Sequence, residues 1–131
     1  MDLSKNVIST DELLKMATEF EPTIKMEIVT DDPEQLVSRS THIASIMATT
    51  GKMLADAKYW RDKALKESIL KRLKGTGLPA STLNDLVKAD CHDLNYLVNW
   101  IEQQDKDCKY QIELLRTLIS LRKQEMATFN Q

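Results

Sequence analysis

The sequence contains few of the residues that build β-sheets and tight turns. Its 131 residues include only three glycines, three prolines and 5% aromatic residues, whereas 42% are hydrophobic. Sheets depend on frequent turns and on aromatic and β-branched side chains, so this composition favours helices. We therefore expect an all-α protein with enough apolar side chains to form a core.

Long apolar runs are also missing. No stretch approaches the roughly 18 apolar residues that a membrane-spanning helix requires. The first residues, MDLSKNVISTDELL, lack the basic and then apolar pattern of a secretory signal. These absences predict a cytoplasmic protein without a membrane partner.

The two cysteines, Cys91 and Cys108, lie 17 residues apart in a region that is predicted to be helical. This spacing corresponds to about 25 Å along a helix, which is too far for a disulfide within that helix. Buried, reduced thiols are the favoured interpretation, and a bridge between two subunits is the alternative.

The longest ordered pattern is a four-three repeat of apolar residues from Val87 to Phe129, interrupted only by Asp105 and Arg122. Steps of four and three residues keep one face of a helix against a neighbouring helix along its whole length. We call this face the seam and predict that it forms a helix–helix contact between subunits. Its principal members are Leu94, Val98, Ile101, Cys108, Ile112, Leu115, Ile119 and Met126.

Residues 1–32 have the pattern of a short helix followed by an extended segment. Ser9 and Glu12 form a capping box, and the helix should end before Pro22. From Thr23 to Thr30, apolar and charged residues alternate with the period of a half-buried strand. A lone strand needs partners for its backbone groups, so it either pairs with a copy in another subunit or lies as an arm between helices. The arm is the favoured interpretation.

Residues 33–131 are predicted to form a long antiparallel helical hairpin. Asp32 and Pro33 begin a first helix of residues 33–74, and Gly75-Thr76-Gly77 would end it. A second helix is predicted over residues 82–129. The connection between them is short, which makes the two helices antiparallel neighbours.

A hairpin of this kind, roughly 60 Å long, is too thin to cover both of its apolar faces. The simplest solution is a homodimer in which two hairpins form a four-helix bundle. An antiparallel partner helix would then place opposite charges beside Asp105 and Arg122, or else both side chains extend into water. The side chains outside the seam that need cover are Leu97, Trp100, Leu114, Leu118 and Leu121.

Charge is distributed unevenly although the net charge is only −2. Residues 1–35 contain nine acidic residues against three lysines, and residues 58–74 contain seven basic residues against two acidic ones. The basic cluster either contacts nucleic acid or reflects the preference of basic residues for helix C-termini. The candidate contact residues are Lys58, Arg61, Lys66, Lys71, Arg72 and Lys74.

No motif for catalysis or cofactor binding is recognisable. Cys91, His92 and Asp93 are consecutive, and consecutive residues on a helix do not face one another. Asp90 and Asp93 have the carboxylate spacing of all-helical nucleotide pyrophosphohydrolases, but the first long helix offers no facing pair. We therefore expect no enzymatic activity, no metal and no cofactor.

These patterns predict a non-catalytic assembly or adaptor protein that works through helix packing, with itself and a further protein as partners. The alternative is a nucleic-acid-binding accessory protein, for example of a phage or mobile element, that uses the basic end of the first long helix.

Overall fold

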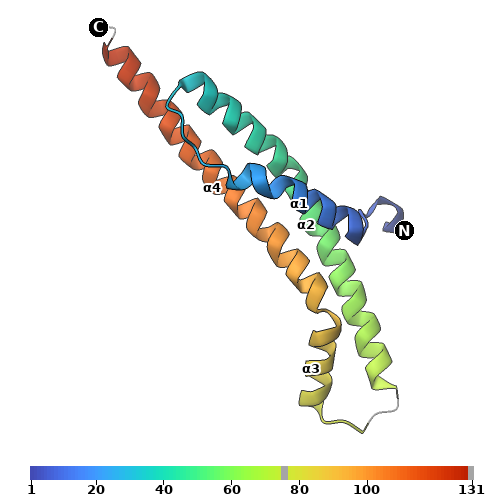
Figure 1. The fold of residues 1–131 in the computed structure, drawn as a ribbon. Helices are drawn as coiled ribbons and strands as arrows, with labels where there is room; N and C mark the ends of the chain where they lie inside the picture. The colour runs from blue at the N-terminus through green and yellow to red at the C-terminus, as the bar shows by residue number, and fades with distance from the viewer. Residues whose placement is uncertain (75–76, 130–131) are drawn as a thin grey trace.

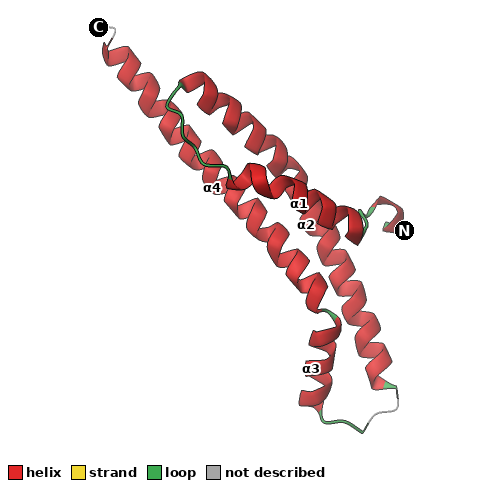
Figure 2. Cartoon of the chain, viewed as in Figure 1, coloured by secondary structure: helices red, strands yellow, loops and turns green. Residues whose placement is uncertain are grey.

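The computed structural model describes residues 1–74 and 77–129, and every regular element in these residues is helical (Figures 1 and 2). The expected all-α class is therefore correct. None of these helices contains an apolar stretch long enough to span a bilayer. The elements are a short 3-10 turn η1 (Ser4–Asn6) and the helices α1 (Thr10–Lys25), α2 (Pro33–Leu73), α3 (Ala80–Asp90) and α4 (His92–Phe129).

The two longest helices, α2 and α4, lie side by side and run in opposite directions (Figure 1). The Asp32 side chain caps α2 by accepting a hydrogen bond from the backbone N–H of Glu34, with Pro33 in the first turn. α2 therefore follows the predicted range of residues 33–74 to within one residue. The helix end predicted at Gly75-Thr76-Gly77 falls largely on residues outside the described ranges.

The core forms where α1 packs against both α2 and α4, while α3 packs mainly on the end of α2. One group of buried residues joins all three of the packed helices: Leu13, Ala17, Met53, Ala57, Leu97, Val98 and Ile101. A second group continues along the bundle: Ile24, Ile43, Ile46 and Cys108. α1 therefore supplies the third wall of a core that two helices cannot enclose.

α1 continues through Pro22 to Lys25, so the predicted helix end before Pro22 was wrong. Proline removes one backbone hydrogen bond and costs a helix interior roughly 3 kcal/mol. The burial of Ile24 against Ile43 of α2 and Cys108 of α4 offsets part of this cost. Tertiary packing of the last turn therefore prevails over the local preference of Pro22.

The strand predicted between Thr23 and Thr30 does not form, because Ile24 belongs to α1 and no residue of this segment is extended into a ladder. Residues 26–32 instead connect α1 to α2 as an arm with neither helix nor strand. The guanidinium of Arg39 donates to the backbone oxygen of Met26 at 2.9 Å. Helix contacts therefore supply partners that a neighbouring strand would otherwise have to provide.

The single helix predicted over residues 82–129 was also wrong, because the chain bends at Cys91 between α3 and α4. The Cys91 backbone N–H donates to the oxygens of Val87 and Lys88 at 3.2 and 3.3 Å. No glycine or proline occurs in either helix to mark this position. The bend is accompanied by a tertiary contact in which the hydroxyl of Ser68 in α2 donates to the carboxylate of Asp90 at 2.6 Å.

The Cys108 thiol should be unreactive in the folded protein. Burial raises the pKa of Cys108 to about 11, with the carboxylates of Asp105 and Asp107 adding to the increase. The folded chain therefore holds this proton more tightly than the unfolded chain. The corresponding stability is complete below the ordinary thiol pKa and is lost as pH rises towards about 11.

A Cys91→Ala variant isolates this thiol for measurement. At about pH 8, an aromatic disulfide reagent should modify Cys108 at the rate of global unfolding, and immediately in denaturant. If the Cys108 thiol of the folded variant reacted as fast as it does in denaturant, the thiol would not be buried.

Candidate functional site

The seam residues of α4 lie against α1 and α2 of the same chain. Val98, Ile101, Cys108 and Leu115 are fully or almost fully buried within one chain. Leu94, Ile112 and Ile119 are half-buried, and Met126 is exposed. The deepest seam positions therefore need no second subunit to cover them.

The two polar seam residues find partners in the same chain. The Asp105 carboxylate accepts from the Thr50 hydroxyl of α2 at 2.7 Å and pairs with Lys109 at 3.2 Å. The Arg122 guanidinium lies 2.7 Å from the carboxylates of both Asp31 and Glu125. Arg122 thus connects the C-terminal part of α4 to the arm, a pairing that sequence spacing did not indicate.

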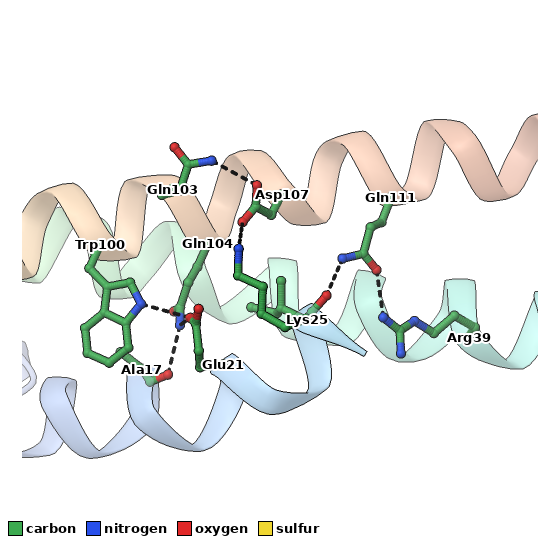
Figure 3. A network of polar contacts seen from close by, with 10 residues as sticks. Ala17, Glu21, Lys25, Arg39, Trp100, Gln103, Gln104, Asp107 and Gln111 are labelled. Atoms are coloured by element: carbon green, nitrogen blue, oxygen red, sulfur yellow. Dashed lines mark hydrogen bonds and ion pairs between the residues drawn. The ribbon is translucent and has the colours of Figure 1, made fainter. Parts of the chain in front are cut away.

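A polar cluster fixes α1 on α4 (Figure 3). The buried Gln104 side chain donates through Nε2 to the backbone oxygen of Ala17 and to the Glu21 carboxylate, each at 2.8 Å. The indole N–H of Trp100 donates to the same carboxylate oxygen at 2.9 Å. Glu21 therefore accepts two hydrogen bonds from α4. We call Glu21, Trp100 and Gln104 the α1 polar cluster.

The end of α1 is held by further polar contacts (Figure 3). Gln111 of α4 donates to the backbone oxygen of Ile24 and accepts from Arg39 of α2 at 2.9 Å. Lys25 pairs with Asp107 of α4 at 3.4 Å. One glutamine thus links all three helices, and it provides a partner for a carbonyl group that the helix end leaves open.

The chain before α1 is attached to α2 through a buried carboxylate. Asp56 accepts from the backbone N–H of Ile8 at 2.8 Å and from Lys52 at 2.7 Å. The indole N–H of Trp60 donates to the backbone oxygen of Ile8 at 2.7 Å, and Lys52 donates to that of Asn6 at 2.8 Å. Asp56 was not among the residues that the sequence patterns singled out. The available signal was an acidic residue between the apolar residues Met53, Leu54 and Ala57.

The basic end of α2 is partly neutralised by the helix that follows it. Arg72 forms a forked ion pair with Asp90 of α3, with N–O distances from 3.0 to 3.2 Å. The hydrogen bonds from Arg72 and then Ser68 hold the pKa of Asp90 below its ordinary value. Arg72 is therefore engaged in positioning α3.

The other candidate contact residues differ in their surroundings. Arg61 pairs with the neighbouring Asp62 at 3.1 Å, and the ammonium of Lys63 lies 5.4 Å from the centre of the Trp60 ring. The exposed members are Lys58, Lys66, Lys71 and Lys74. Lys58, Lys66 and Lys71 occupy different sides of α2, because their spacings of eight and five residues correspond to very different directions on a helix, and Lys74 follows the last residue of the helix.

An exposed apolar face runs along α4 beyond the part that α1 covers. α1 shields Trp100 and Leu97, whereas Leu114 and Leu121 remain 51% and 49% exposed. Beside this face is a hollow of about 500 Å³ whose walls include Met26 and Ile28 of the arm. Successive members of the face are spaced by four, four and three residues, which places them on one side of a helix. We call the face the α4 ridge, formed by Tyr110, Leu114, Leu118 and Leu121.

The consecutive residues Cys91, His92 and Asp93 differ in their exposure to water. Cys91 is buried, whereas the side chains of its neighbours His92 and Asp93 are exposed. Within residues 1–74 and 77–129, no group of three or more metal-ligating side chains is placed to hold a metal ion.

Comparisons with protein-family models, curated proteins and solved structures found no match to this chain.

Replacement of Glu21 by alanine tests the α1 polar cluster. The change leaves the Trp100 indole N–H and one hydrogen of Gln104 without their acceptor, so we expect a loss of about 1–3 kcal/mol in the free energy of unfolding. Urea denaturation followed by circular dichroism and by tryptophan fluorescence measures this loss. The exposed Glu19 of the same helix provides the matched control, Glu19→Ala, which should change stability by less than about 0.5 kcal/mol. Equal losses in the two variants would contradict the role of Glu21.

Proposed function

We propose that this protein is a non-catalytic assembly or adaptor protein that forms a homodimer through the α4 ridge. One observation carries the proposal. The accessible surface of the chain is 9165 Å². A compact monomer of the same mass, 15.0 kDa, exposes roughly 7,000 Å². This chain therefore exposes about 2,000 Å² more surface to water than a compact monomer of the same mass.

The excess surface is large enough for a stable interface between two copies. A standard interface buries about 800 Å² on each partner. Part of the excess arises because α1 spans only the middle of the long helices, so that α2 is the only described helix beside the C-terminal part of α4, which the arm covers only in part (Figure 1). A second copy that covers this part would complete a four-helix cross-section.

The α4 ridge suits a symmetric contact between identical helices. Leu114 and Leu121 are separated by seven residues, the spacing at which one helix presents successive side chains to another. Ridge-to-ridge contact around a two-fold axis places each leucine near the same surface of the other copy. The buried, free thiols of Cys91 and Cys108 suit the reducing cytoplasm in which we place this assembly.

Light scattering tests the dimer. We expect a mass twice 15.0 kDa at tens of micromolar, with little change on adding salt, because the contact is apolar. Leu114→Asp and Leu121→Asp should each return the mass to that of one chain, since a charge in the ridge loses water without gaining a partner.

Two controls make the mass measurement decisive. Leu70→Asp changes a side chain that is also exposed but lies near the C-terminal end of α2, at the opposite end of the long helices from the ridge, and it should leave the dimer intact. Circular dichroism should show unchanged helix content in all three variants. A wild-type protein that stays monomeric at about 100 µM would refute the dimer.

The second candidate function is nucleic-acid binding at the basic end of α2. The observation that favours it is the exposure of Lys58, Lys66, Lys71 and Lys74 within the last part of α2 and at its C-terminal end. Phosphate groups attract such lysines, and the half-exposed Tyr59 beside them can stack on an unpaired base.

Binding to a fluorescent single-stranded oligonucleotide tests this candidate. If phosphates are the ligand, the dissociation constant should rise steeply between about 50 and 200 mM salt. Substituting Lys71 and Lys74 with glutamate should reduce the slope of that salt dependence. No binding of single- or double-stranded nucleic acid at low salt would exclude the candidate.

A further inference from the structure

An apolar groove lies between the end of α2 and α3. It encloses about 210 Å³, and its apolar walls include Ile69 and Leu73 from α2 and Leu83 and Val87 from α3. Ile69 and Leu73 are 41% and 65% exposed. We call this the tip groove. The chain places large apolar side chains there without burying them.

The position of α3 creates the groove. Asp90, the last residue of α3, is fixed to α2 by the forked ion pair with Arg72 and by the hydrogen bond from Ser68. Asp90 also keeps its charge to low pH, because those hydrogen bonds lower its pKa. The walls of the groove are thus held together by polar contacts at one edge. The apolar faces do not close on each other.

The surroundings of the groove are basic. Residues 58–90 contain eight basic residues against four acidic ones. Lys66 precedes Ile69 by three residues and Leu73 by seven, which puts its exposed ammonium on the same side of α2. Lys88 follows Val87 at the end of α3 and is exposed. Arg72 is one of the groove walls, but its charge is shared with Asp90.

We propose that the tip groove binds an acidic amphipathic helix of a partner protein. Such a helix offers an apolar stripe for Ile69, Leu73 and Leu83 and carboxylates for the surrounding lysines. The proposal goes beyond homodimer formation, because the tip groove and the α4 ridge are separate surfaces at opposite ends of the long helices (Figure 1).

Other occupants fit less well. A second copy docking tip to tip would bring two basic clusters together, which costs energy. The chain's own acidic helix, α1, is packed on α2 and α4 through Leu13, Ala17 and Ile24, and among the described helices it makes no contact with α3. Nucleic acid would use the lysines but gain little from an apolar groove, since phosphates are the main source of non-specific affinity.

Fluorescence anisotropy with a defined probe tests the proposal. The probe is a labelled synthetic helix of about 18 residues with leucine at every third or fourth position and glutamate on the opposite face. The full chain should bind it, and a scrambled peptide of identical composition should bind at least about tenfold more weakly. Leu73→Glu should weaken binding of the amphipathic peptide about tenfold, because it places a carboxylate in the groove.

Matched variants separate the contributions of the groove, of the surrounding charge and of correct folding to peptide binding. Val37→Glu, at an exposed position near the other end of α2, should bind the peptide like the wild type. Lys66→Glu combined with Lys88→Glu should weaken binding about tenfold and reverse the preference for an acidic over a basic peptide. Leu114→Asp should retain peptide binding even where it abolishes the dimer, so failure of one proposal does not imply failure of the other.

Three results would overturn the proposal. These are no peptide binding at about 100 µM protein, equal binding of the scrambled peptide, or wild-type affinity in the Leu73→Glu variant with its helix content intact. The surface would instead belong to nucleic acid if an oligonucleotide displaced the bound peptide and bound the Leu73→Glu variant with the same affinity as the wild type.

Discussion

The packing of α1 on α2 and α4 is the interaction on which the rest of the structure depends. Two helices side by side touch along a line and leave most of their apolar faces open. α1 brings Leu13, Ala17 and Ile24 into the open side and converts the middle of this pair into a three-helix core. Its length, 16 residues against 41 and 38 for α2 and α4, sets how far that core extends.

Polar side chains determine where α1 lies. Apolar packing alone tolerates shifts of a helix along its neighbours, whereas a buried hydrogen bond is satisfied in few positions and costs about 1–3 kcal/mol when broken. Asp56 fixes the chain before α1, and Gln104 and Gln111 fix the middle and end of that helix on α4. These contacts fix the register of a bundle whose apolar residues are mostly interchangeable leucine, isoleucine and methionine.

Beyond α1 no third helix of the described residues lies along the whole of the long pair, and a different segment partly covers the apolar faces at each end. At one end the arm and Arg122 cover part of α4 but leave the α4 ridge in water. At the other end α3 turns back on α2 and leaves an apolar groove among lysines. The exposed apolar surfaces therefore lie where the core stops, as a direct consequence of the short reach of α1. We propose a copy of the same chain for the first end and an acidic partner for the second.

The sequence by itself determined the helical class, the start of α2 and the helix-facing side of α4, because each rests on local signals. These signals are few turn residues, the Asp32-Pro33 start and the four-three repeat. Only the tertiary structure decided that α1 passes through Pro22, that the chain bends at Cys91 and that α1 supplies the third wall of the core. In each case contacts between residues distant in sequence prevail over local preference: Ile24 is buried against two helices, and Asp90 binds Arg72. Local periodicity records which side of a helix is apolar, but it does not record which element will cover that side.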